Sequence, residues 1–270
     1  MIDAKSKEVE RFLAKPDIHQ QWVSAYRTAE NEPFFEQAFD YIARVLNAPK
    51  NSIFLDVGCG TCAHSIRLAN RGFFVQAVDL SEYVLKEAEA NVKAKGLETK
   101  ISLQREDVCS LSFEDETFSY ILCWGILMHI PDLEAAISEL VRVLKPGGTL
   151  VIGENNMYSL HTIIYRNLKR LLGREKASVK KTPAGTEYWT TTSAGTLLVR
   201  EANTQWLIER FKSKGLTVKK HIAREFTELY VYFSSPLLKS LIHCFNNFWF
   251  KYIKIPHLAH GSLVILQKEK

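Results

Sequence analysis

The pattern of hydrophobic and polar positions changes character near residue 50 of the chain. Residues 5–48 are predicted to be mainly helical, because apolar side chains recur at three- and four-residue spacing from Phe34 to Leu46 and Pro33 stands at a favourable helix start. Beyond this point, short and mainly apolar segments predict buried strands over 53–57 and 73–78, and further strands over 101–105, 118–124 and 149–154. The intervening stretches predict helices over 64–71, 81–95 and 133–144.

Strands that alternate with helices over short loops predict a parallel sheet with helices on both faces. The run from Tyr120 to Trp124 is apolar throughout, as expected of a strand that is covered on both sides. The alternation breaks after Glu154, where an amphipathic helix is followed by a stretch rich in Thr, Ser and Gly without a period, up to residue 200. Later elements are predicted as a helix over 203–214, a strand over 216–222, an amphipathic segment after Pro236 and a strand over 262–267.

We therefore expect one domain over residues 1–270, with a helical region over 1–48. Its core is expected to comprise 49–154, 203–222 and 262–268. Helical insertions at 155–202 and 223–261 are expected to form a cap over the substrate.

The composition, 46% hydrophobic and 24% charged, is that of an ordinary globular protein. The first residues are charged and lack the apolar core of a signal peptide, no run is long enough to span a membrane, and the five cysteines are too few for a disulfide framework. A cytoplasmic location is expected. The net charge of +5 is concentrated in residues 166–181, which contain seven Lys and Arg residues and a single acidic residue, Glu175. Such a segment is either a solvated surface or a site for an anionic partner.

The sharpest motif runs from Leu55 to Cys62, where a strand turns into a helix. Gly58 and Gly60 allow the main chain to approach a ligand closely. Asp79 ends the next strand, where its carboxylate can accept both hydroxyls of a ribose. Because Gly58-x-Gly60-x-x-Ala63 also matches the dinucleotide fingerprint, a nicotinamide-dependent oxidoreductase is an alternative, as is a cofactor-binding protein without catalytic activity.

Two further carboxylates distinguish between these cofactors. Asp56 precedes Gly58 by two residues, where it would repel a pyrophosphate and attract the ammonium group of an amino acid. Asp107 follows the third strand and can accept a hydrogen bond from an adenine amine. Together with Asp79, they predict a cleft for a zwitterionic nucleoside without phosphate.

With these motifs, the sequence resembles the class I S-adenosylmethionine-dependent methyltransferases, in the group of the ubiquinone/menaquinone-type and small-molecule enzymes. Residues 55–62 resemble the first motif of the family, Asp79 its second acidic position, Asp107 and Val108 its adenine-binding position, and 140–154 its fifth-strand motif. The resemblance implies an α/β, Rossmann-like, doubly wound sheet of seven strands in the order 3-2-1-4-5-7-6, with the last strand antiparallel. It also implies S-adenosylmethionine as cofactor and S-adenosylhomocysteine as product.

The resemblance also assigns roles to individual residues. Asp56 would steer the methionine end, the turn Gly58-Cys59-Gly60 would pass under the cofactor, and Asp79 would bind the ribose. The remaining contacts implied are Leu80, Asp107 and Val108 around the adenine, Cys123 and Trp124 near the sulfonium, and Tyr26 as a ring over the cofactor. The chain departs from the family at Cys62, where a third glycine is common; only backbone contacts are needed there.

The expected reaction is direct in-line methyl transfer to a small-molecule or lipid-like acceptor. His129 follows the fourth strand and is a candidate general base, or alternatively a structural residue that caps a helix or binds a loop carbonyl. The candidate substrate residues, each also explicable by packing, are Tyr158, His161, Tyr165, Tyr188 and Trp189.

The amphipathic segments at 160–172 and 237–255 could pack on the sheet edge, or could cover an apolar acceptor and touch an anionic membrane. Nucleic acid is not a favoured partner, because the fourth strand ends without the motif used on exocyclic base amines. The pair Cys59 and Cys62 has a redox spacing, but the glycine motif already explains this turn. No metal site is predicted, because Cys109 and Cys123 are too far apart in sequence to complete one.

Overall fold

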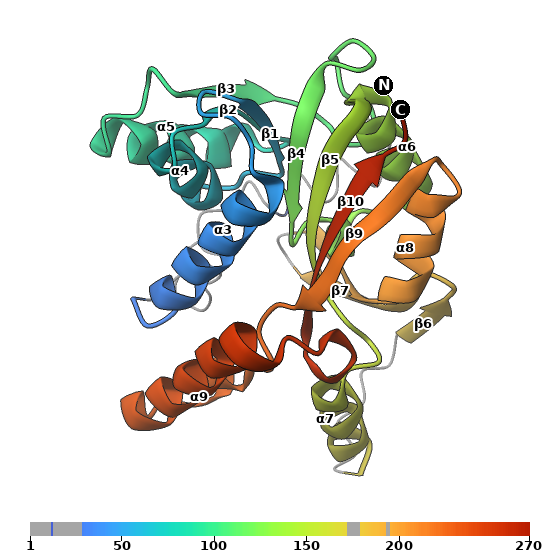
Figure 1. Ribbon diagram of the computed structural model, residues 1–270. Helices are drawn as coiled ribbons and strands as arrows, with labels where there is room; N and C mark the ends of the chain where they lie inside the picture. The colour runs from blue at the N-terminus through green and yellow to red at the C-terminus, as the bar shows by residue number, and fades with distance from the viewer. Residues whose placement is uncertain (1–11, 13–28, 172–178, 193–194) are drawn as a thin grey trace.

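The apolar runs predicted as strands form one seven-stranded sheet in a computed structural model of the chain (Figure 1). The structure describes residues 12, 29–171, 179–192 and 195–270, so that Tyr26 lies outside the described residues. The strands of this sheet are β1 (Ile53–Val57), β2 (Phe74–Asp79), β3 (Ile101–Arg105), β4 (Phe118–Trp124), β5 (Leu144–Asn155), β9 (Leu216–Ala223) and β10 (Gly261–Lys268). The helices are α3 (Glu32–Leu46), α4 (Ala63–Asn70), α5 (Glu82–Ala94), α6 (Leu133–Val143), α7 (Leu160–Leu171), α8 (Thr204–Lys212) and α9 (Pro236–Phe248), with short helical turns η1 (Leu127–His129), η2 (Leu229–Tyr232), η3 (Trp249–Ile253) and η4 (Pro256–Leu258).

The strand order is β3-β2-β1-β4-β5-β10-β9, and β10 is antiparallel to both β5 and β9. Counted within this sheet, β9 is the sixth strand and β10 the seventh, which confirms the expected order 3-2-1-4-5-7-6 and the antiparallel last strand. The order reverses between β1 and β4, because the chain first builds outward to β3 and then returns to the other side of β1. In open α/β sheets, ligands bind at this reversal, beyond the carboxyl ends of the strands.

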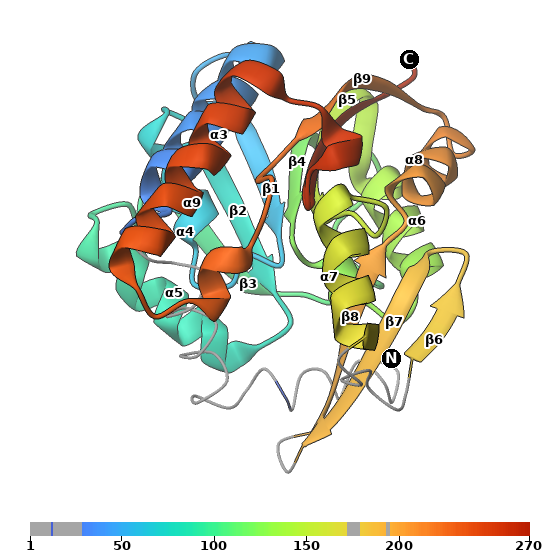
Figure 2. The ribbon, with the colours of Figure 1, turned by 90° about the horizontal axis from the view of Figure 1, so that it is seen from below.

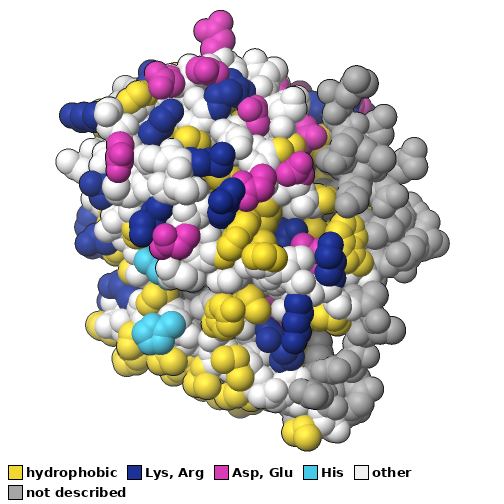
Figure 3. Space-filling model, turned by 90° about the vertical axis from the view of Figure 1, so that its right-hand side faces the viewer, with side chains coloured by type: hydrophobic (Ala, Val, Ile, Leu, Met, Phe, Trp, Pro, Cys, Tyr) yellow, Lys and Arg dark blue, Asp and Glu magenta, His cyan; other side chains and the backbone are white. Residues whose placement is uncertain are grey.

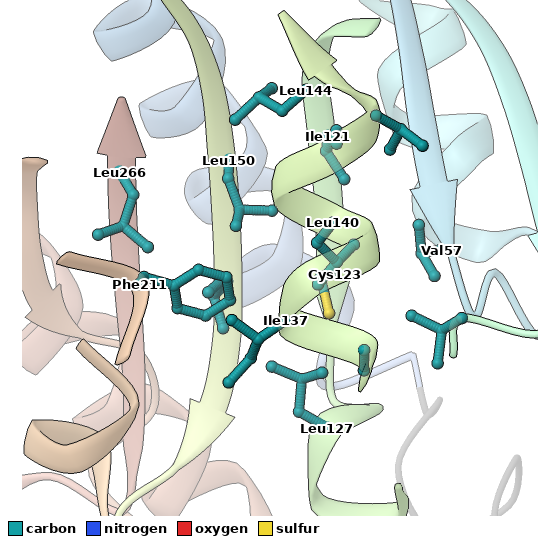
Figure 4. Close-up of a cluster of buried hydrophobic side chains, with 14 of the residues drawn as sticks. Val57, Ile121, Cys123, Leu127, Ile137, Leu140, Leu144, Leu150, Phe211 and Leu266 are labelled. Carbon is teal, nitrogen blue, oxygen red and sulfur yellow. The ribbon is translucent and has the colours of Figure 1, made fainter. Parts of the chain in front are cut away.

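Two hydrophobic cores lie on the two faces of the sheet, as expected for strands that are apolar throughout. One core joins α6 and α8 to the sheet and the other joins α3, α4 and α5 to the opposite face (Figures 1 and 2). Neighbouring residues of one strand enter different cores: Ile121 packs with Leu140 and Phe211 in the first core, whereas Leu122 packs in the second (Figure 4).

The insertion after β5 differs from its expected form. Beyond α7, it forms a three-stranded antiparallel sheet of β6 (Val179–Thr182), β7 (Gly185–Thr192) and β8 (Gly195–Ala202). The amphipathic helix at the start of the insertion is confirmed as α7, but the stretch after it, which was expected to have no regular period, is a sheet rather than an irregular or helical segment. Threonine explains the error, because it is polar like a loop residue but β-branched like a strand former.

Replacing Phe211 tests the first core. Its ring is fully buried against the sheet. We expect Phe211→Ala to lower the free energy of unfolding by about 3–5 kcal/mol, because it leaves a cavity that the close-packed core cannot refill. Chemical denaturation measures the change. Phe248→Ala is the matched control, since half of that side chain is exposed and its loss should cost less than about 1 kcal/mol. Equal losses for the two variants would contradict the assigned core.

Candidate active site

A cavity of about 880 Å³ opens at the carboxyl ends of the strands, next to the reversal between β1 and β4. Gly58, Cys59 and Trp124 line it from the strand tips. Its other walls come from α3, η1, α7, the sheet β6–β8, α9 and the residues after β9. Both insertions thus border the same cavity as the glycine motif.

The glycine motif forms a turn whose backbone requires its residue types. Gly58 has φ +67° and Gly60 has φ +54°, in the left-handed region that favours glycine. A Cβ atom at Gly58 would lie 2.2 Å from Cγ2 of Ile126, so that a side chain there would collide with the loop after β4. Cys62, where the family often has a third glycine, also has a positive φ of 64° and precedes α4.

Asp79 connects this turn to the end of β2. Its Oδ2 accepts a hydrogen bond from the Gly60 amide at 2.9 Å, and its Oδ1 accepts one from the Ser81 amide at 3.0 Å. These two hydrogen bonds hold the carboxylate next to the glycine turn. Asp56 is buried under the turn, where the Ser65 hydroxyl donates to it at 2.5 Å.

The end of β3 lies next to the end of β2, because the Glu106 amide donates to the Asp79 carbonyl at 3.1 Å. The Asp107 carboxylate accepts from the Cys109 amide at 2.9 Å, and Val108 belongs to the first core. The Leu80 carbonyl accepts from Arg105. Of the residues predicted to hold the cofactor, Gly58, Cys59 and Trp124 line the cavity, whereas Asp56, Gly60, Asp79, Leu80, Asp107, Val108 and Cys123 are not among its lining residues.

Cys123 is fully buried in the first core, on the face of β4 that carries α6 (Figure 4). The structure therefore does not bring it to the cavity with Trp124.

The thiol of Cys59 is unsuited to redox chemistry. A hydrogen bond with Cys62 and burial raise the pKa of the Cys59 thiol well above its usual range, which disfavours the reactive thiolate.

His129 lines the cavity from η1, directly after β4. Its Nδ1 lies 2.8 Å from the Leu198 carbonyl, which only accepts, so that Nδ1 carries the proton and Nε2 the lone pair. Burial lowers the pKa of the imidazole, against the opposing effect of the Leu198 hydrogen bond. The neutral form that a base requires is thus the dominant form near neutral pH.

A buried ion pair holds the loop that carries His129. The Arg200 guanidinium donates to the Leu127 and Ile130 carbonyls at 3.0 and 2.9 Å and pairs with Glu187 at 2.9 Å. Glu154, at the end of β5, accepts from the Leu127 amide at 2.8 Å. Burial raises the pKa of the Glu154 carboxyl to about 7, although the charge of Arg224 opposes the shift.

Three of the five predicted substrate residues reach the cavity: His161, Tyr165 and Tyr188. Both ring nitrogens of His161 are buried without a hydrogen-bond partner, and burial lowers the pKa of this imidazole to about 4. Burial and the charge of Glu201 raise the pKa of Tyr188 to about 12. Tyr158 is exposed and Trp189 donates to Glu187, and neither lines the cavity.

A buried ionic cluster that was not predicted from the sequence lines the cavity and is formed by Arg224, Glu225, Glu228 and His260. Arg224 pairs with Glu225 at 2.5 Å and lies 5.3 Å from the centre of the Trp124 ring. His260 pairs with Glu228 at 3.2 Å. Nε of Arg224 and Oε2 of Glu225 are buried without a hydrogen-bond partner.

A signal for this cluster exists in the sequence. Arg224 and Glu225 directly follow β9. Because β9 runs parallel to β5, these two residues lie at the same edge of the sheet as Asp79. The rule that selected Asp79 could have selected them, but residues 224–260 were interpreted as part of the cap.

Comparisons with known proteins agree with this geometry. A family model described as a methyltransferase domain matches residues 55–152. An uncharacterized protein of Haemophilus influenzae is 30% identical over 182 residues, which cover 66% of this chain and 70% of that protein. The demethylmenaquinone methyltransferase of Geobacillus kaustophilus is 35% identical over 163 residues, 59% of this chain and 68% of that enzyme.

The matches to the demethylmenaquinone methyltransferases of three Bacillus species cover about half of their length, between 48% and 51%. Among solved structures, the PH0226 protein of Pyrococcus horikoshii has a TM-score of 0.63 at 17% identity and covers 95% of this chain and 100% of that one. At this identity, the likeness supports the fold alone.

The ionic cluster predicts a dependence of stability on pH. Burial raises the pKa of the Glu228 carboxyl, but His260 and Arg224 outweigh it and hold the pKa at about 2, below the usual 4.5. A depressed pKa stabilises the fold above pH 4.5, and this contribution is lost as the pH falls toward 2. We expect Glu228→Gln to reduce the acid-induced loss of unfolding free energy in this window by about 3 kcal/mol.

Denaturant titrations at several pH values measure this loss. Glu98→Gln, at an exposed position, serves as the control and should follow the wild type. A Glu228→Gln variant with the same acid dependence as the wild type would contradict the buried pairing.

Proposed function

This chain belongs to the class I S-adenosylmethionine-dependent methyltransferases, and we propose that its cavity brings the methyl donor and a small-molecule acceptor together. S-adenosylmethionine is the cofactor of this family. When bound, it supplies a methyl group activated by a sulfonium. Because the donor is already activated, the protein's main task is to align the two partners and exclude water.

The arrangement around the glycine turn carries this proposal. Gly58 and Gly60 let the backbone approach a ligand, and the carboxylate of Asp79 is held beside them. Three carboxylates, Asp56, Asp79 and Asp107, stand at the ends of three adjacent strands and suit a cationic donor better than a diphosphate. This electrostatic difference also disfavours the nicotinamide alternative.

We assign the donor contacts as follows from this placement. Gly58, Cys59 and Gly60 would pass under the donor, and Asp79 would accept from the ribose hydroxyls. Asp56 would orient the methionine end, and Trp124 would border the sulfonium. Leu80, Asp107 and Val108 would surround the adenine.

The acceptor would occupy the part of the cavity between η1, α7 and the ionic cluster. His161, Tyr165 and Tyr188 border it, and Arg224 and Glu225 offer unpartnered polar atoms. Apolar side chains complete the lining: Phe34, Phe35, Leu197 and Val199. This mixture suits an acceptor with a polar reacting end and an apolar body, such as a lipid-like molecule, which would bring the protein into contact with a membrane.

His129 would act as the base when the acceptor must lose a proton. Its Nε2 carries the lone pair, and the hydrogen bond of Nδ1 to Leu198 would stabilise the imidazolium that forms. Arg200 would act as a positioning residue, since it binds the carbonyls on both sides of His129.

Binding of S-adenosylhomocysteine tests the donor site. We expect Asp79→Ala to weaken binding in calorimetry about tenfold or more, because a charged hydrogen-bond acceptor for the ribose is lost. Asp79→Asn keeps the volume but can accept from only one of the Gly60 and Ser81 amides, so that thermal melting of both variants is measured alongside to detect a disturbed turn. Glu98→Ala, which removes an exposed carboxylate, should bind like the wild type. An unchanged affinity in both Asp79 variants would count against the ribose contact.

Turnover tests the role of His129. The wild type, incubated with a metabolite extract and a donor carrying a labelled methyl group, should reveal the methylated acceptor. With that acceptor, His129→Ala should reduce the rate about 10²–10⁴-fold while the affinity for S-adenosylhomocysteine stays the same. A variant with full turnover would show that His129 is not the base, without affecting the assignment of the donor site.

A further inference from the structure

Helix α9 turns its polar side chains toward the protein. Asn246 is buried, accepts from the Thr227 amide at 3.1 Å and donates to the Thr227 carbonyl at 2.9 Å. Asn247 accepts from Gln37 of α3 at 3.1 Å. His243 is also buried, with its ring 4.4 Å from that of Tyr230. These contacts fix which face of the helix points inward.

The apolar side chains of α9 consequently point to the outside. Leu237 is 70% exposed, Leu241 58% and Phe248 50%, and Tyr252 of η3 is 64% exposed. An amphipathic helix on the surface of a water-soluble protein normally turns its apolar side chains inward and its polar side chains toward the solvent. Contiguous exposed apolar surface of this kind marks an interaction site.

A second helix adds to this surface. Leu160, Ile163 and Ile164 of α7 are also exposed, and the Tyr165 ring lies 5.4 Å from that of Tyr232 next to α9. Both helices lie at the lower end of the molecule in Figure 1 and face the viewer in Figure 2. Along the lower edge of Figure 3, hydrophobic side chains gather on the surface.

The charges on these two segments have one sign. Residues 236–255 contain Lys239, Lys251 and Lys254 and no acidic residue. Residues 160–171 contain no acidic residue either, and their Arg166 lines the cavity, where it pairs with Glu201. Exposed apolar side chains accompanied by lysine and arginine are the features of helices that lie in the interface of an anionic bilayer. Among the described residues, no helix is long and apolar enough to span a bilayer.

We propose that α9 and α7 together form a docking surface for an anionic membrane, with their outward apolar side chains inserted between the lipid headgroups. A second copy of the chain fits this surface less well, because two such faces would bring like charges together. An anionic bilayer satisfies both the apolar and the basic side chains.

The docking surface adjoins the cavity. What this position means for the acceptor rests on the proposed function. Asn246 lines the cavity from the inner side of α9, and His161 and Tyr165 line it from α7. The two helices that would lie on the membrane are therefore walls of the acceptor site. A lipid-like acceptor could pass between bilayer and cavity without crossing water.

Vesicle flotation of the full chain tests the docking surface. The wild type should float with vesicles of phosphatidylcholine and phosphatidylglycerol, and much less with phosphatidylcholine alone. Leu237→Gln combined with Leu241→Gln should weaken the binding about tenfold or more, because two exposed leucines lose their burial in the interface. Lys251→Gln should weaken binding to the anionic vesicles only.

Matched variants elsewhere on the surface are the controls. Ile53→Thr combined with Val218→Thr removes exposed apolar side chains from strands, and Lys93→Gln removes an exposed lysine from α5; all should bind as the wild type does. Thermal melting and S-adenosylhomocysteine binding show that each variant is folded, independently of vesicle binding.

Two results would overturn the proposal. One is equal flotation of the wild type and the double leucine variant. The other is a concentration-dependent dimer without vesicle binding that the leucine variant abolishes, since the surface would then be an interface between two copies.

Discussion

The backbone amides of Gly60 and Ser81 donate to the same carboxylate, that of Asp79, and the geometry of the donor side follows from these two hydrogen bonds. They join the turn after β1 to the end of β2 and the start of α5, on one side of the point at which the sheet order reverses. A buried carboxylate is costly unless it is hydrogen-bonded, so that the turn and Asp79 stabilise each other. Position 58 within this turn must be a glycine, because Ile126 leaves no room for a side chain there.

The acceptor side depends on another kind of constraint. The sheet β6–β8 is joined to the loop after β4 by Arg200 and by the hydrogen bond of His129 to Leu198. The ionic cluster of Arg224, Glu225, Glu228 and His260 joins β9 to the start of β10. Each group compensates the charge of another, which allows charged side chains to lie against the cavity. Trp124, over whose ring Arg224 lies, links the proposed donor side to the proposed acceptor side.

Much of the fold could be predicted from the sequence, because β1, β2 and β4 are mainly apolar segments, and glycine or aspartate stands at their carboxyl ends. The donor turn could be predicted for the same reason, since its chemistry lies within a few consecutive residues. The threonine-rich strand β7 could not, because its pairing partner β8 rather than its own pattern makes it a strand. Periodicity also indicated that α9 is amphipathic but not which face points inward; Thr227 and Gln37, distant in sequence, decide that.

The residues that line the cavity were predictable only in part. His161 and Tyr165 lie on one face of a helix, one turn apart, and both reach the cavity. Tyr158 precedes the helix and points outward, a difference that depends on where α7 begins. The ionic cluster brings together residues up to 36 positions apart, from 224 to 260, and no local pattern contains that contact.

We infer that a turn surrounded by carboxylates selects a cationic adenosine donor that lacks phosphate. A crystal structure of the protein with S-adenosylhomocysteine would show whether the turn holds such a nucleoside. We expect the ligand to lie over Gly58 and Gly60, with its ribose hydroxyls on Asp79 and its amino acid end toward Asp56. A turn left empty at saturating ligand, or one that instead holds the diphosphate of a nicotinamide dinucleotide, would contradict it.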